Sequence, residues 1–297
     1  MLRSPLPTVD GVSPSCKFLP AGHWKTVLDF LKERYPKVLV SDWLSRMKKG
    51  EVVDENGRAL NPDTPYCAGI HIFYYREVDS EIKIPFLERI IHEDEHILVI
   101  DKPHFLPVTP SGRFLRETLL VRLKKNGKWK NLVPLHRIDR ETAGIVLFSH
   151  NPATRGKYAF LFQSRMVTKV YEALAPSNSD LSFPLKRRSR IVRGEPFFRM
   201  KEVEGISNAE TDISFVEEMA GGALYKLQSV TGKKHQIRLH LASVGIPIFN
   251  DRLYPDLRDK TNDDFFNPLR LLVKALIFKD PITGQARCFG SAGALEQ

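Results

Sequence analysis

The 297-residue sequence has few cysteines and no long apolar run. Its three cysteines, Cys16, Cys67 and Cys288, lie far apart and form no CxxC pair, which argues against a disulfide framework and a zinc site. No apolar stretch reaches the roughly 18 residues of a membrane-spanning helix, and the Pro- and Ser-rich N-terminus has no secretory signal pattern. We therefore expect a cytoplasmic protein that does not bind a membrane.

Signatures of cofactor binding are missing too. The chain contains no GxxxxGK[ST] loop, no GxGxxG loop and no HExxH helix. These motifs indicate nucleoside triphosphate binding, dinucleotide binding and zinc-dependent hydrolysis, respectively. These three chemistries therefore have no motif support in the sequence.

Acidic residues are outnumbered by basic ones. There are 45 Lys and Arg residues against 35 Asp and Glu, which gives a formal net charge of +10 and a pI near 9.5. The long-range field of such a chain favours a polyanionic partner, and nucleic acid is the first candidate. The sequence shows neither a coiled coil nor an obvious apolar interface strip, so a monomer is expected.

The first part of the chain predicts a small α/β unit after an irregular arm at residues 1–22. Two short helices, at 26–36 and from Ser41 to Gly50, precede two strands that flank an Asn56–Gly57 turn. Helices followed by a hairpin resemble the S4-type RNA-binding module. We expect this module at residues 23–80, with RNA contacts around Arg46, Lys48 and Lys49.

A different pattern begins near residue 86. Apolar runs alternate irregularly with helical stretches, and regular βαβ repetition is missing. This predicts an α+β domain at 86–290, with a large mixed, mainly antiparallel sheet flanked by helices. The expected strands include 97–100, 145–148, 169–174, 223–230 and 271–278, and the expected helices are 116–125, 154–165 and 235–243.

The segment HRIDRETAGIVLF at 136–148 places Asp139 between Arg137 and Arg140, just before a bend at Gly144. A neighbouring guanidinium favours the ionised form of an acid. A charged, partly desolvated carboxylate can act as a nucleophile. The alternative is a surface ion pair beside a strand, which is the more common role of such a string.

Three further segments carry candidate residues. Tyr171 lies in the alternating strand VTKVYEALA, where a tyrosine most often packs in the core. Arg238 lies in TGKKHQIRLHL, in a helix that could also be a basic surface. The segment LKRRSRIVRGEPFFRMK at 185–201 mixes basic and aromatic residues, which suits phosphates and unstacked bases, although a flexible solvated loop explains it nearly as well.

Taken together, these segments resemble the RluA-type pseudouridine synthases. IDKPHFLPVTPSG, HRIDRETAGIVLF, VTKVYEALA, TGKKHQIRLHLASVGIPI and LLVKALIFKDPITG are similar to that family's motifs, in order, across residues 90–284. The resemblance implies that the protein converts uridine in RNA to pseudouridine without a cofactor. Three departures concern loop geometry: Ala143 replaces a frequent serine, His104–Phe105 replaces a small residue and glycine, and Asn250 replaces a frequent glycine.

By this resemblance, Asp139 is the essential carboxylate, which either attacks the ribose C1′ or removes a 2′ proton. Arg238 is its ion-pair partner, so the task of keeping Asp139 charged passes from the local arginines to a distant one. Tyr171 stacks on the uracil and helps to remove the C5 proton. Ile237 lines the apolar side of the pocket.

The remaining expected site residues contact the RNA. His136 and Arg137 are assigned to phosphate contact or base flipping, although His136 can equally be structural. The basic segment is expected to bind phosphates through Arg187, Arg188 and Arg190.

Two rivals belong to other classes. A non-catalytic RNA-binding or ribosome-assembly protein with the same fold would be expected to lack Asp139, Tyr171 or Arg238. A hydrolase using His136 and Asp139 has little support, because residues three apart in one bend rarely pair and GxSxG is missing. Ribosomal RNA is the favoured substrate, with transfer RNA the alternative.

Overall fold

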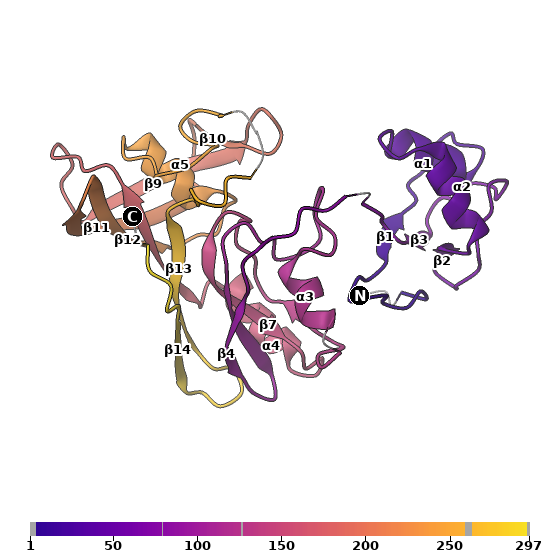
Figure 1. The fold of residues 1–297 in the computed structure, drawn as a ribbon, viewed down its shortest axis with the longest axis horizontal. Helices are drawn as coiled ribbons and strands as arrows, with labels where there is room; N and C mark the ends of the chain where they lie inside the picture. Colours follow the sequence, from indigo (N-terminus) through magenta and orange to yellow (C-terminus); the bar gives the residue numbers. More distant parts are fainter. Residues whose placement is uncertain (1–3, 79, 126, 259–262, 296–297) are drawn as a thin grey trace. The chain divides into compact units, whose positions relative to one another are not determined.

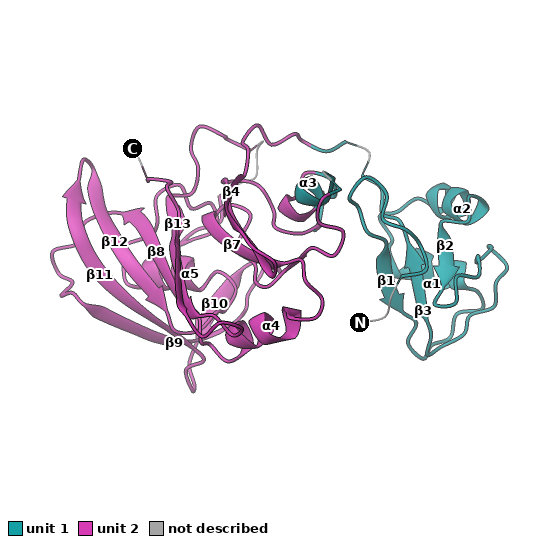
Figure 2. Ribbon diagram, turned by 90° about the horizontal axis from the view of Figure 1, so that it is seen from below, with its two compact units in different colours: residues 1–81, 111–116, 121–127 teal, residues 82–110, 117–120, 128–297 magenta. Residues whose placement is uncertain are grey.

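The computed structural model describes residues 4–78, 80–125, 127–258 and 263–295. The chain divides into two compact units (Figure 2): one contains residues 1–81, 111–116 and 121–127, and the other contains 82–110, 117–120 and 128–297. Within the described residues, no helix combines the length and apolar character needed to cross a bilayer.

The first unit is a three-stranded antiparallel sheet, in the order β1-β3-β2, with two helices. Thr26 caps α1: its hydroxyl accepts from the Asp29 N–H (3.1 Å), and the Asp29 carboxylate accepts from the Thr26 N–H (3.2 Å), forming a capping box. Both helices lie where the sequence predicts them, whereas β1 falls in the stretch expected to be irregular. Its elements are β1 (Ser15–Phe18), α1 (Val27–Arg34), α2 (Val40–Lys48), β2 (Val52–Asp54) and β3 (His71–Tyr74).

The basic face expected on α2 is smaller than the sequence suggests. Arg46 is buried, pairs with Glu77 at 3.2 Å, and lies 4.9 Å from the ring centre of Trp43. Lys48 and Lys49 are exposed. Only these two lysines of the expected trio can therefore reach a phosphate, and the S4-like character of the unit stays a prediction.

The second unit is built on an 11-stranded sheet with the path β10-β9-β11-β12-β8-β13-β7-β5-β4, to which β14 and β6 add (Figure 1). All pairs are antiparallel except β13 with β7, which confirms the expected mainly antiparallel α+β fold. Its elements are β4 (Arg89–Glu93), β5 (Ile97–Lys102), β6 (Val133–Pro134), β7 (Ala143–Ser149), α4 (Arg155–Gln163), β8 (Thr168–Ala175), β9 (Leu185–Arg193), β10 (Met200–Val203), β11 (Ala209–Met219), β12 (Gly222–Ser229), α5 (Gln236–Ser243), β13 (Leu271–Lys279) and β14 (Ala286–Gly290). The helix α3 (Leu119–Lys125) is divided, because its residues from Val121 on belong to the first unit.

The basic segment at 185–201 is not a loop. Leu185–Arg193 forms β9, which pairs with β11 on one edge and with β10 on the other. Carboxylates on the neighbouring strands neutralise part of its charge, so a run of arginines can form a strand here. The loop alternative was wrong for residues 185–193, because the charges of this stretch hid its alternation of partly buried and exposed positions.

Gly144 allows β7 and β13 to run in parallel just after the Asp139 segment. Its φ of +110° lies in the region that favours glycine, and a Cβ there would lie 2.3 Å from the Val273 carbonyl oxygen. A side chain at this position therefore requires the two strands to move apart. The bend that follows Asp139 depends on a glycine.

Two departures from the family pattern concern backbone conformation. Phe105 and Asn250, which stand where glycine is frequent, have φ values of +65° and +62°. Both positions keep the left-handed backbone that glycine adopts easily, and asparagine tolerates it better than phenylalanine does. Phe105 is held there by packing, because its ring meets that of Phe265 edge-on at 5.2 Å.

Candidate active site

The segment that carries Asp139 connects β6 to β7 and is anchored through its backbone. Lys102, at the end of β5, is 1% exposed, and its ammonium donates to the carbonyl oxygens of Pro103 (2.8 Å), Leu106 (2.8 Å) and Arg140 (3.2 Å). The His104 Nδ1 donates to the Glu141 carbonyl at 2.6 Å. Burial lowers the pKa of Lys102 to about 7 and that of His104 to about 4. These contacts fix the two residues that follow Asp139.

The arginines that flank Asp139 in sequence have other surroundings. The Arg140 guanidinium donates two hydrogen bonds to Asp263, at 3.0 and 2.7 Å, and one to Glu141 at 3.1 Å. Arg137 is exposed. The first interpretation, in which these neighbours hold the charge of Asp139, therefore gives way to one centred on Arg238.

Arg238 lies on α5 and is 1% exposed. Its Nε and Nη2 donate to the two carboxylate oxygens of Asp251, at 2.7 and 2.6 Å, while Nη1 lies 3.6 Å from Asp139 Oδ2 and 3.8 Å from Glu141 Oε2. Burial opposes the charge, but Asp251 and then Asp139 and Glu141 outweigh it and raise the pKa of Arg238. The guanidinium thus has one firm partner and presents its other edge to Asp139.

Glu141 shares this charge cluster. Burial opposes its ionisation, but Arg238 and Arg140 together lower the pKa of Glu141 to about 2. Asp139 and Glu141 therefore place two carboxylates against the free edge of one guanidinium. The sequence analysis identified neither Glu141 nor the bidentate bond between Arg238 and Asp251.

His235 is a further neighbour of Asp139. It precedes α5 with a left-handed φ of 56°, which turns its ring toward Tyr254 (Nδ1 to Oη, 3.0 Å) and Asp139 (Nε2 to Oδ1, 3.8 Å). The Tyr254 hydroxyl accepts from the Met200 N–H at 2.8 Å, so its own hydrogen can be donated to His235. Burial lowers the pKa of His235, which favours a neutral ring with its Nε2–H toward Asp139.

Tyr171 and Ile237 meet on the same side of the sheet. Tyr171 lies on β8 opposite Leu227 of β12 and packs against the cluster that contains Ile237 of α5. Burial raises the pKa of Tyr171 to about 12, and the charge of Asp139 adds to the effect. The phenol is therefore neutral at physiological pH and offers a flat apolar face.

We expect the rate of turnover to be independent of Tyr171 ionisation. Since the pKa of Tyr171 is about 12, a phenolate base would make kcat rise tenfold per unit between about pH 6.5 and 9, whereas a neutral phenol that only stacks on uracil should show no such rise. Measuring kcat across that range for the wild type and Tyr171→Phe checks this. A tenfold rise per unit that Tyr171→Phe abolishes would show instead that the phenolate acts as the base.

His136 has a structural environment. Its Nε2 accepts from the Leu147 N–H at 3.0 Å, its ring stacks on Phe162 at 4.7 Å, and burial lowers its pKa to about 3. A ring with this pKa is a poor general base at neutral pH, which removes the basis for the hydrolase alternative. Its Nδ1 is buried and has no hydrogen-bond partner in the described part of the chain, so the expected contact of His136 with RNA stays a prediction.

The three arginines of β9 lie on two faces of the sheet. Directly opposed residues share a face, and the pairs Tyr171–Leu227, Leu227–Ile213 and Ile213–Leu185 place the odd-numbered side chains of β9 on the face of Tyr171. Arg187 is therefore on the site's face, where it pairs with Glu202. Arg188, which pairs with Glu210 at 2.8 Å, and Arg190 are on the other face. Their role in phosphate binding stays a prediction.

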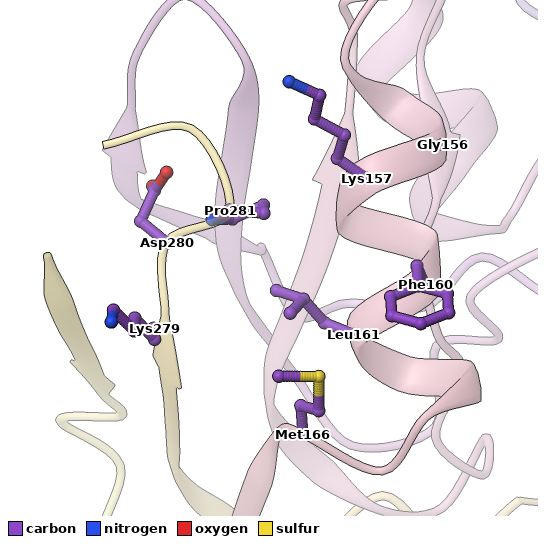
Figure 3. A pocket seen from close by; sticks show the side chains of 8 residues that line it. All are labelled: Gly156, Lys157, Phe160, Leu161, Met166, Lys279, Asp280 and Pro281. Carbon is purple, nitrogen blue, oxygen red and sulfur yellow. The ribbon is translucent and has the colours of Figure 1, made fainter. Parts of the chain in front are cut away.

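A groove of about 540 Å³ lies beside α4, with the helix on one side and the turn after β13 on the other (Figure 3). None of the expected site residues lines it. Two phenylalanines of α4 therefore have different surroundings: Phe162 stacks on His136, whereas Phe160 lines the groove. The lining residues are Gly156, Lys157, Phe160, Leu161, Met166, Lys279, Asp280 and Pro281.

Comparison with known proteins supports one family. Residues 96–243 match the family described as RNA pseudouridylate synthase. An uncharacterised RNA pseudouridine synthase of Synechocystis sp. is 29% identical over 233 residues, covering 77% of this chain and 79% of that protein. The mitochondrial tRNA pseudouridine(32) synthase of Saccharomyces cerevisiae is 32% identical over 172 residues, covering 56% of this chain and 37% of that protein.

The fold is shared with a solved structure. Human RNA pseudouridylate synthase domain containing 1 superposes with a TM-score of 0.57 at 20% identity, covering 72% of this chain and 86% of that chain. Asp139, Tyr171, Ile237 and Arg238 all lie within the matched segment 96–243. The chain therefore belongs to the RNA pseudouridine synthase family of the RluA type.

Proposed function

We propose that this protein isomerises specific uridines in structured RNA to pseudouridine, with Asp139 as the essential carboxylate. One observation carries the proposal: Asp139, whose side chain is 25% exposed, lies 3.6 Å from the free edge of a fully buried guanidinium, inside the segment that matches the family. A carboxylate so placed is reachable from solvent and remains next to a fixed positive charge. An accessible carboxylate beside a buried guanidinium is therefore a candidate for a chemical role.

The reaction breaks the bond between uracil N1 and ribose C1′, and a new bond forms between C5 and C1′. The hydrogen on C5 leaves as a proton while N1 gains one, so the product is an isomer of the substrate. Asp139 either attacks C1′ or removes a 2′ proton, and both roles require the ionised carboxylate. The target base must leave the stack, which costs a few kcal/mol unless it is already unpaired.

For the other site residues we propose the roles that the resemblance implies, and the contacts described above support them. Arg238 holds the charge of Asp139, Tyr171 provides the surface on which uracil stacks, and Ile237 forms the apolar wall. Arg137, which is exposed at the start of the Asp139 segment, can meet the backbone of a flipped nucleotide, whereas His136 supports that segment through its hydrogen bond to Leu147. No step requires a metal or an organic cofactor, and we propose a monomer that works in the cytoplasm.

Ribosomal RNA is the substrate that we propose, because the first unit offers a second, S4-like surface for a large structured RNA. Transfer RNA is the second candidate, since the Saccharomyces relative carries a tRNA activity in its name. The experiment is to map pseudouridines in total RNA from cells that lack the gene. We expect at least one uridine in ribosomal RNA to lose its modification and to regain it with the wild-type gene but not with Asp139→Asn.

Other outcomes of the mapping are equally informative. Loss of a site in transfer RNA would replace the first candidate by the second. An unchanged pseudouridine map would favour the non-catalytic RNA-binding alternative. Recovery with Asp139→Asn would remove that carboxylate from its role.

A further inference from the structure

Lys169 is a cation next to the site that the reaction described above does not use. It precedes Tyr171 by two residues on β8, so both side chains point to the same face, about 7 Å apart along the strand. Its ammonium lies 5.6 Å from the ring centre of Phe162, and a Cβ on Gly232 would lie 3.6 Å from its Nζ. Lys169 thus lies between α4 and the turn that leads into α5.

Among the described residues, the half-buried ammonium of Lys169 lacks the polar partners that the fully buried Lys102 and Arg238 have. The Lys102 ammonium donates to three carbonyl oxygens, and Arg238 is bound by Asp251. Burial alone lowers the pKa of Lys169, and no carboxylate among the described residues opposes that effect. A largely enclosed cation without an anion is costly unless a ligand supplies the counter-charge.

The groups around Lys169 do not supply that counter-charge. His136 is neutral, because burial lowers its pKa to about 3, and Phe162 offers only the face of its ring. On the third side, Gly232 has no side chain and Lys233 and Lys234 follow it, so the turn is open and positive. The missing partner is an anion that enters from solvent.

The substrate brings such an anion. Uracil is neutral, whereas each nucleotide carries a phosphate with a full negative charge. When uracil lies on Tyr171, the phosphates of the same nucleotide must lie within one nucleotide's reach of that ring. Lys169 and the open turn at Gly232 are the positive features at that distance along β8.

We propose that Lys169 binds a phosphate oxygen of the target nucleotide and holds its backbone while the base lies against Tyr171. The contact uses the space left by Gly232, whose backbone does not require the left-handed conformation. This inference rests on the proposed function, since it takes the bound nucleotide to be the one that reacts. Lys169 is then a substrate-binding residue, in addition to the residues that act on the base.

The test compares Lys169→Met and Lys169→Arg with Lys226→Met, which removes an exposed lysine from the opposite face of β12. The dissociation constant for a fluorescent oligouridylate is measured over a series of salt concentrations. Lys169→Met should weaken binding about tenfold at low salt, the effect of one charged hydrogen bond. It should also reduce the logarithmic salt slope by about 0.7, the value for one phosphate contact to a single strand. Lys169→Arg should restore most of both, and Lys226→Met should change neither.

Gly232→Val is the second variant, because it keeps the charge but fills the space beside the ammonium. It should weaken oligouridylate binding as Lys169→Met does, with an unchanged melting temperature. The proposal is overturned if Lys169→Met leaves the salt slope of binding unchanged. This holds even if kcat falls, because a fall in kcat without a change in slope would mean that Lys169 contacts the uracil and not a phosphate. Binding is measured without turnover. A wild type that binds with the expected salt slope but isomerises no uridine would therefore contradict the proposed function and leave the proposal for Lys169 standing.

Discussion

Replacing Arg238 by methionine is expected to lower the free energy of unfolding by about 3–5 kcal/mol, the usual effect of removing one partner of a buried ion pair. The cause is Asp251, which is 3% exposed and binds the Arg238 guanidinium through both oxygens. Without Arg238 this carboxylate stays buried with no countercharge. Urea unfolding of the wild type and Arg238→Met measures the effect.

A second substitution separates the stability of this pair from its part in turnover. Asp251 Oδ1 also accepts from the N–H groups of Leu253 (2.8 Å) and Tyr254 (3.2 Å), and the carbonyl oxygen of asparagine can keep both bonds. Arg238→Met with Asp251→Asn should therefore recover a large part of the lost stability. It should recover no turnover, because Asp139 has still lost its guanidinium. A double variant that is both stable and active would show that Arg238 serves only the fold.

Asp139→Asn is expected to reduce kcat by at least about a thousandfold, since it removes the group that either attacks C1′ or takes a proton. Stability should change by less than about 1 kcal/mol, because the contacts of Asp139 with Arg238 (3.6 Å) and His235 (3.8 Å) are longer than hydrogen bonds and Asp139 is partly exposed. RNA binding should be retained or slightly tightened, since one negative charge leaves a site that receives a polyanion. Kinetics, urea unfolding and RNA titration of the same preparation measure the three quantities.

The matched control is Asp180→Asn, which makes the same chemical change at an exposed position that follows β8. It should leave kcat, stability and RNA affinity unchanged. A comparable loss of kcat in both variants would mean that the assay responds to net charge and not to the carboxylate at 139.

The parts of the fold that sequence predicts well are those with one strong periodicity. Thr26 and Asp29 indicate the start of α1, because a helix cap depends only on residues close in sequence. The apolar run after Gly144 indicates β7, because a continuous apolar pattern is typical of a buried strand. β9 was misread because its arginines are partly neutralised by carboxylates on β10 and β11, strands that become neighbours only on folding. Arg46 was misread for a related reason: its charge is taken up by Glu77, 31 residues later.

The candidate site also has parts that the sequence predicts and parts that only the structure shows. Resemblance to a family identified Asp139, Tyr171, Ile237 and Arg238, and the structure brings these four residues to one side of the sheet. The interactions of Arg238 with Asp251 and of Lys169 with its surroundings depend on long-range packing, so no local pattern could reveal them. The two faces of β9 likewise appear only from the strand register, which separates Arg187 from Arg188 and Arg190.

The central claim is that Asp139 makes this protein a uridine isomerase, and tritium release tests it most directly. RNA labelled with tritium at C5 of uridine loses that label when C5 is joined to C1′. Total RNA from cells that lack the gene is the substrate, so that the target uridines are still unmodified. We predict release by the wild type and by Asp180→Asn, and none above background by Asp139→Asn. Release by Asp139→Asn equal to that of the wild type, or none by the wild type, would contradict the account.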